Sequence, residues 1–437
     1  MNNLRLLTGL LSATLLGGGV RSYAQSVITL EQIFETAETN SAQLRPVFTA
    51  QAEAGCAASV ARTDRLPDIS ASLSASYIGD GFTTKRDFSG YRKASIPHFG
   101  NGLSLNVIQP VYTGGAVTSG IELAELKSTA SRYATDFQRD NIRFQLTGFY
   151  LDIYKYGNLR RVMESNLFAA KNVLEKMLAR HEQGTVLQND IIRYELLVSD
   201  LELQLVRINN TLDILNTNLV KTAGLPEETV IVPDSAILAR SIPVQGEHWW
   251  QQEATAHSPL LSLARSGVGI SRKAERIVRS ERLPKVGIQA GWTIDGPILV
   301  EVPPINRNLS YWYIGVGVSY NISSLYKSNK ALAKSRIATQ RAIEELGAEY
   351  EKVSLAVRAD HVHYLEAYEE LKTQQKSTEL AERNYRTVST RYLTGMALIT
   401  DMLDATNAKL NAEKQLVNAR INIIYYYYKL LFTTGKI

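Results

Sequence analysis

The chain repeats one structural unit, and this repeat constrains the fold more than any single motif does. Three residues of the first unit recur at the same spacing in the second: Arg180 with Arg391, Gly184 with Gly395, and Asp190 with Asp401. A leucine and proline pair also precedes a strand-like run in each half: Leu66 and Pro67, then Leu283 and Pro284. We therefore expect two copies of one unit, in which a helix, a β-hairpin, a very long helix, a sharp turn and a second long helix follow each other.

This repeat predicts how the chain is divided. The predicted parts are a signal peptide (1–24), a first repeat (25–223) with a β-hairpin at about 68–112 and a helical hairpin at about 115–223, a linking segment (224–246), and a second repeat (247–437) with a β-hairpin at about 285–322 and a helical hairpin at about 325–432. The linking segment is placed where prolines cluster around a short β-rich run, because such clusters mark irregular structure.

The first residues have the features of an export signal. Arg5 precedes an apolar run from Leu6 to Val20, and Ser22, Tyr23 and Ala24 give small residues at the positions that a signal peptidase reads. The alternative is a membrane anchor, but this apolar run of about 15 residues is shorter than the roughly 20 residues that a spanning helix needs. We therefore predict a cleaved signal peptide.

Composition and motifs argue against several classes of protein. Cys56 is the only cysteine, so no intrachain disulfide can form. The formal net charge of +5 is spread along the chain and does not form the basic patch of a nucleic-acid-binding protein. No nucleotide-binding loop is present, and His361 and His363 stand two residues apart, a spacing that does not share a helix face. We expect no cofactor and no enzyme activity.

Two long stretches without proline predict the helices. They run from Val111 to Leu225 and from Ile305 to the last residue, and both are rich in helix-forming residues. Expected helices are about Ala116–Glu182, Asn189–Thr222, Leu325–Tyr392 and Thr400–Phe432. A heptad seam with steps of three and four runs along the third of these: Ile343, Leu346, Tyr350, Val353, Val357, Asp360, Tyr364, Ala367 and Leu371. A helix of this length spans about 100 Å, which predicts a rod rather than a compact domain.

Apolar and small polar residues alternate in four segments, and this pattern predicts β-strands. The apolar positions are Ile69, Ala71, Leu73, Ala75 and Tyr77; Leu103, Leu105 and Val107; Val286, Ile288, Ala290 and Trp292; and Trp312, Ile314, Val316, Val318 and Tyr320. Such strands suit a transmembrane β-barrel, with lipid outside and water inside, although a half-buried soluble sheet alternates in the same way. Four strands cannot close a barrel, so a barrel requires several chains.

The segments ITLEQIFETAETNSAQLRP and RYLTGMALITDMLDATNAKL, together with the duplicated halves, resemble the TolC family of outer-membrane factors. The resemblance implies a mainly α fold with β-strands: a homotrimer in the outer membrane, whose twelve-stranded transmembrane β-barrel continues into a periplasmic α-helical coiled-coil barrel. It implies the exit duct of a tripartite efflux pump or type I secretion system, a passive channel that works with a periplasmic adaptor and an inner-membrane transporter. The alternative is a secreted or periplasmic coiled-coil scaffold, which would not need the strands.

The same resemblance implies where the channel closes. It places Gly184 and Gly395 in the turns at the periplasmic tip, where the adaptor binds, and Asp190, Tyr392, Asp401 and Asp404 at the gate. By this resemblance Asp401 and Asp404 correspond to two acidic rings that narrow the entrance, while Tyr392 and Asp190 correspond to positions that take part in the bonds that hold the tip shut. Ala397 departs from the pattern, because the best-known members carry an arginine there. The alternative for the carboxylates is a solvated face near a helix N-terminus, where the helix dipole favours negative charge.

Overall fold

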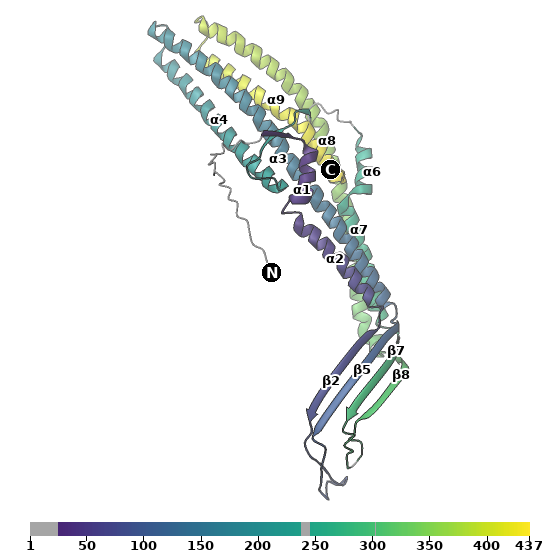
Figure 1. The fold of residues 1–437 in the computed structure, drawn as a ribbon. Helices are drawn as coiled ribbons and strands as arrows, with labels where there is room; N and C mark the ends of the chain where they lie inside the picture. The colour runs from purple at the N-terminus through teal and green to yellow at the C-terminus, as the bar shows by residue number, and fades with distance from the viewer. Residues whose placement is uncertain (1–24, 237–244, 302) are drawn as a thin grey trace, which may run out of the picture.

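The computed structural model describes residues 25–236, 245–301 and 303–437 of the 437-residue chain. The predicted signal peptide, residues 1–24, lies outside the described residues. The molecule is elongated: a four-stranded sheet lies at one end, and the tips of two helical hairpins lie at the other (Figure 1). No helix among the described residues is both long enough and apolar enough to cross a bilayer.

The elements follow each other in nearly the same order in the two halves. In the first half they are β1 (Gln25–Ile28), α1 (Leu30–Asn40), α2 (Arg45–Thr63), β2 (Asp68–Tyr77), β3 (Gly81–Thr83), β4 (Arg92–Ala94), β5 (Phe99–Tyr112), α3 (Ala116–Glu182), α4 (Gln188–Ala223) and β6 (Val230–Pro233). In the second half they are α6 (Glu247–His257), α7 (Pro259–Ser280), β7 (Lys285–Gly296), β8 (Leu309–Ser319), α8 (Ser324–Leu393) and α9 (Ile399–Thr434). The four long helices lie within two residues of the bounds expected from the sequence.

The expectation of one helix before each pair of strands was wrong, because two helices stand there in each half. The helical structure is interrupted at Ser41, between α1 and α2, and at Ser258, between α6 and α7. In both cases a proline occupies the first turn of the following helix. Proline has no N–H to donate and restricts the residue before it, so it suits a helix start and ends the preceding helix. Pro259 begins α7 directly after Ser258, which closes α6 by donating from its backbone to the carbonyl of Ala254.

The four strands form one antiparallel sheet in the order β2-β5-β7-β8. Its register aligns the predicted apolar positions: Leu73 pairs with Leu103, Leu105 with Trp292, and Trp292 with Trp312. One face of the sheet is therefore apolar across all four strands, as the alternation predicted. The opposite face is small and polar, and there the hydroxyls of Ser72 and Ser104 lie 2.8 Å apart.

Two features of the strands were not predicted. The sequence predicted one hairpin in each repeat and did not say which strands pair between the repeats. In the structure β5 pairs with β7 and so joins the two repeats into one sheet. A short second hairpin, β3 with β4, extends beyond the outer end of β2 and β5. Tyr320, expected on the apolar face, lies just after β8, which ends at Ser319.

The two longest helices, α3 with 67 residues and α8 with 70, form the length of the rod. The predicted seam on α8 is buried from Val353 to Ala367, where α8 packs on α9 and α6. Its polar position, Asp360, is buried against α9, where it accepts a hydrogen bond from Thr433 and lies 3.0 Å from the ammonium of Lys429. Ile343, at the start of the predicted seam, is instead 40% exposed, because α9 ends near Asp360 and leaves this part of α8 without that partner.

The middle of the molecule has its own core, in which the linking segment is held against the helices. β6 pairs in parallel with β1. Asn216 of α4 donates to the carbonyl of Thr229 and accepts from the backbone N–H of Ile231, both at 2.9 Å. The buried hydroxyl of Tyr150 in α3 donates to the carbonyl of Ile28 and accepts from the backbone of Asp234. These hydrogen bonds hold β1 and β6 in place, because two short paired strands are only marginally stable on their own.

Candidate functional site

The two turns at the helical tip have the same backbone structure. Gly184 and Gly395 adopt φ angles of 71° and 78°, the left-handed region that only glycine enters readily. After α3, the N–H of Thr185 donates to the carbonyl of Arg180; after α8, the N–H of Met396 donates to the carbonyl of Arg391. Both turns are Schellman motifs, which end a helix with a glycine. The built position of a Cβ at either glycine meets no atom within 4 Å, so conformation rather than space requires glycine here.

Arg180 connects the two turns. From the last turn of α3, its guanidinium donates to the carbonyl oxygens of Tyr392 at 3.3 Å and Leu393 at 3.0 Å, at the end of α8. These carbonyls lie in the last turn of a helix, where the main chain lacks helical partners and the dipole attracts a cation. Its repeat counterpart Arg391 is exposed, and among the described residues its side chain makes no hydrogen bond or ion pair. Arg180 therefore fastens the tip of one helical hairpin to the tip of the other.

Tyr392 lies under this connection. It is 6% exposed and packs in the apolar cluster of the tip with Ile191 and Met402. Burial raises the pKa of its hydroxyl, the negative charge of Asp190 raises it further, and Arg180 partly offsets both effects. Among the described residues the hydroxyl has no hydrogen-bond partner. A buried hydroxyl without a partner is unfavourable, so this oxygen weakens the packing of the tip rather than stabilising it.

The carboxylates of the tip differ from each other. Asp401 accepts a hydrogen bond from the backbone N–H of Leu398 at 3.1 Å, so it caps the first turn of α9 and remains exposed. Asp404, one turn further on, is also exposed, and within the described part of the chain it has no ion-pair partner. Asp190 is half-buried in the first turn of α4 beside Tyr392. The structure thus brings Asp190, Tyr392 and Arg180 together, and leaves Asp401 and Asp404 facing solvent.

Comparison with known proteins assigns this architecture to a family. The family profile described as Outer membrane efflux protein matches residues 250–433. The chain belongs to this outer membrane efflux protein family. It is 22% identical over 409 residues to the "Pyoverdine export outer membrane protein OpmQ" of Pseudomonas aeruginosa, with 90% of this chain and 82% of that protein covered. It is also 22% identical over 338 residues to the "Outer membrane efflux protein BepC" of Brucella suis, with 77% and 72% covered.

Solved structures share the fold of this efflux protein. The outer membrane protein VceC of Vibrio cholerae superposes with a TM-score of 0.79 at 15% identity, over 93% of this chain and 96% of that one. The chain therefore has the TolC-like fold, mainly helical with β-strands. The family match identifies it as an outer-membrane efflux channel rather than an enzyme. Channels of this family assemble as trimers.

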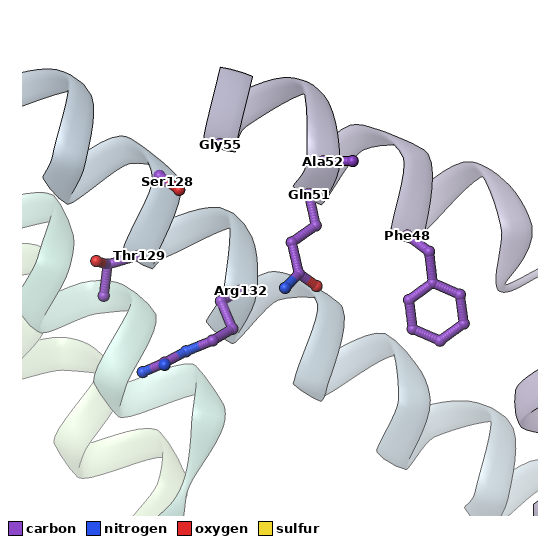
Figure 2. Close-up of a pocket in the computed structure, with 7 residues that line it drawn as sticks. All are labelled: Phe48, Gln51, Ala52, Gly55, Ser128, Thr129 and Arg132. Carbon is purple, nitrogen blue, oxygen red and sulfur yellow. The ribbon is translucent and has the colours of Figure 1, made fainter. Parts of the chain in front are cut away.

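The groove between α2 and α3 of this efflux protein offers no competing catalytic site. One groove of about 440 Å³ lies between α2 and α3, and Figure 2 shows Gln51 reaching from α2 toward α3 while the Arg132 side chain points away from it. Its remaining lining residues are Phe48, Ala52, Gly55, Ser128 and Thr129. It contains no pair of acid and base groups for catalysis. Among the described residues, no three His, Cys, Asp or Glu side chains are placed to hold a metal ion.

Sequence reasoning did not find Arg180 as a tip residue, although the signal was present. Arg180 and Arg391 are the first matched pair of the repeat. Their identity suggested equal roles, whereas only Arg180 meets the other hairpin. The difference depends on which hairpin lies beside which, and that is a property of the tertiary structure.

Proposed function

We propose that this channel is the exit duct of a tripartite efflux pump or type I secretion system. Three copies of the four-stranded sheet would close a twelve-stranded barrel in the outer membrane, and the helical hairpins would continue it as a coiled-coil barrel into the periplasm. The observation that carries this proposal is the sheet itself. Its apolar face is continuous across four strands, yet β2 and β8 have no neighbour on their outer sides among the described residues. An open sheet edge in lipid leaves backbone N–H and C=O groups without hydrogen-bond partners, which is strongly unfavourable. Neighbouring chains therefore have to pair with these edges.

A second apolar row on α4 supports assembly along the helices. Five residues on the side of α4 that faces away from α3 are 46–66% exposed in the single chain: Ile192, Leu196, Leu203, Val206 and Ile214. Their spacing of mostly three, four or seven residues is typical of a coiled-coil seam. A neighbouring chain that packs here would remove this surface from water. A coiled-coil scaffold could use the same row, but it would have no need for the apolar sheet.

We propose that the channel is gated at its periplasmic tip. In the trimer, Asp401 and Asp404 would form rings around the entrance, and their exposure supports this placement. Asp190 and Tyr392 would take part in the bonds that hold the tip shut in the closed state. The turns around Gly184 and Gly395 would contact the periplasmic adaptor, which couples the duct to an inner-membrane transporter.

Exposed apolar side chains beside these turns support the adaptor contact. Leu187 is 71% exposed, Met396 78% and Leu398 70%. An exposed apolar cluster at the end of a rod suits a docking surface for another protein. We propose a small molecule as the cargo. The first candidate is a molecule of the pyoverdine kind, because OpmQ is described as a pyoverdine export protein.

The proposed units are the two repeats, 25–223 and 247–437, joined by the segment 224–246. The repeated Schellman turns and the repeated helix pairs before the strands support this division.

One experiment tests assembly and adaptor contact together. Cys56 is the only cysteine, so Cys56→Ala gives a cysteine-free background. A photoreactive label on Leu398→Cys should cross-link to a periplasmic adaptor in cells, whereas a label on the exposed Ser74→Cys in β2 should not. The purified protein should be a trimer by light scattering. A folded monomer in detergent, or equal cross-linking from both positions, would contradict the proposal.

A further inference from the structure

The β3–β4 hairpin carries features that the proposed duct does not require. It follows Tyr77 at the end of β2 and precedes Phe99 at the start of β5, which pair with each other on the apolar face and are 80% and 68% exposed. Aromatic residues at the ends of barrel strands mark the level of the lipid headgroups. The hairpin lies just beyond this level, at the end of the molecule opposite the helical tips (Figure 1). In the barrel that we propose above, on which this inference rests, the hairpin therefore stands at the outer surface of the membrane.

The hairpin exposes aromatic rings. Phe82 and Tyr91 pack on each other with ring centroids 5.3 Å apart, and both are more than 60% exposed. Phe88 at the tip is 88% exposed and has a φ angle of 62°. Bulky residues are uncommon in this left-handed region. The turn is nevertheless fixed, because Lys85 donates from its backbone to the carbonyl of Ser89 and the N–H of Phe88 donates back to the carbonyl of Lys85, both at 2.9 Å.

The same hairpin has cations without acidic partners. Asp80 already forms an ion pair with Lys93, with 2.7 Å between the carboxylate and the ammonium. Asp87 forms no ion pair with a described residue; its carboxylate accepts hydrogen bonds within the turn from the backbone N–H and the hydroxyl of Ser89. Three further cations of the hairpin are exposed, and none of them forms an ion pair with a described residue: Lys85, Arg86 and Arg92. The hairpin therefore carries both free positive charge and exposed aromatic rings.

We propose that the β3–β4 hairpin binds the phosphorylated headgroups of lipids in the outer leaflet. Guanidinium and ammonium groups bind phosphate through charge-assisted hydrogen bonds, and arginine does so with two donors at once. Exposed aromatic rings settle at the boundary between headgroups and acyl chains, where one side of the ring is apolar. An anionic solute in water would satisfy the cations but would leave Phe82, Phe88 and Tyr91 in water. A phosphorylated lipid satisfies both sets of groups.

The test uses the full-length trimer in detergent and two fluorescent probes: lipid A with its phosphates, and the same lipid after enzymatic removal of the phosphates. The wild type should bind the phosphorylated probe at least about tenfold more tightly, since each basic residue near an anionic lipid surface contributes several-fold to binding. The triple variant Lys85→Gln, Arg86→Gln, Arg92→Gln should lose this preference. A matched triple variant on exposed helical positions, Lys176→Gln, Arg193→Gln, Arg358→Gln, should keep it.

The variant Phe88→Ser separates the contribution of the aromatic rings from the contribution of the cations. This variant should bind both probes more weakly and keep the preference for phosphate, because the cations are unchanged. Light scattering must give a trimer for each variant, so that lost binding is not lost assembly. Equal affinity of the wild type for both probes would overturn the proposal, as would equal loss in the matched triple variant. If the hairpin triple variant kept lipid binding and changed only the ion selectivity of the pore, the hairpin would line the conduction path and the proposal would be wrong.

Discussion

Replacing Arg180 with alanine should weaken the connection between the two hairpin tips, which we propose belongs to the closed state of the channel. The guanidinium makes two hydrogen bonds to the carbonyls at the end of α8, and it is the side chain that ties the two hairpin tips together there. A hydrogen bond from a charged donor contributes about 1.5–3 kcal/mol when it is buried. Arg180 is half-buried and one bond is long at 3.3 Å, so we assign about 1–2 kcal/mol to both bonds together in each chain. Three chains in a trimer would give about 3–6 kcal/mol.

This magnitude predicts a measurable change in gating. If opening separates the two hairpin tips, the energy is lost only from the closed state. Since about 1.4 kcal/mol corresponds to a factor of ten, the ratio of open to closed channels should rise about 10²-fold to 10⁴-fold. Single-channel recording in planar bilayers would measure this as a higher resting open probability. Arg180→Lys should fall between the wild type and Arg180→Ala, because lysine keeps the charge and loses the planar fork.

The repeat supplies the control. Arg391→Ala removes the same side chain from the equivalent position of the second unit, where the described residues give it no partner. It should leave the open probability close to that of the wild type. If Arg391→Ala opened the channel as much as Arg180→Ala, the loss of a positive charge at the tip would be sufficient, and the hydrogen bonds to α8 would not be the cause.

Three further predictions concern other parts of the channel. Asp401→Ala with Asp404→Ala should abolish block by multivalent cations added to the tip side of a planar bilayer, while leaving the trimer intact; undiminished block would remove these carboxylates from the entrance. Burial raises the pKa of Asp140 in α3 to about 6, so its stabilising contribution is fully present below about pH 4 and is lost as pH rises through 6. Asp140→Asn should therefore raise the unfolding temperature at pH 8 and have little effect at pH 4; an equal effect at both would refute this. Leu73→Arg should impair outer-membrane assembly, at about 2–4 kcal/mol per chain, more than Ser74→Arg does; equal impairment would refute the assigned faces.

Local rules predicted the long elements of this fold well. Helices α3 and α8 end just before Gly184 and Gly395, because a glycine in the left-handed conformation commonly closes a helix. The apolar face of the sheet followed from alternation alone, because side chains on a strand point to opposite faces in turn. These features depend on a few neighbouring residues, which the sequence displays directly.

Features that depend on distant partners were missed. The pairing of β5 with β7 joins residues from both repeats, and no local pattern distinguishes it from two separate hairpins. The seam on α8 was extended too far toward Ile343, because the heptad pattern does not reveal where α9 ends. Arg180 was missed as a fastening residue because its acceptors are backbone carbonyls, which every residue type has.

Arg180 also bears on the unusual residue at the tip. Ala397, where the resemblance to the TolC family implies an arginine, is half-buried and packs against the apolar cluster around Tyr392. No cation can therefore reach the tip carboxylates from this position, and the arginine at the tip bonds to carbonyls rather than to Asp401 or Asp404. Carbonyls do not titrate, so this fastening should hold across a wide pH range. In the gate that we propose, the carboxylates around the entrance would be free to attract cations, so the groups that close the tip would differ from the groups that select ions.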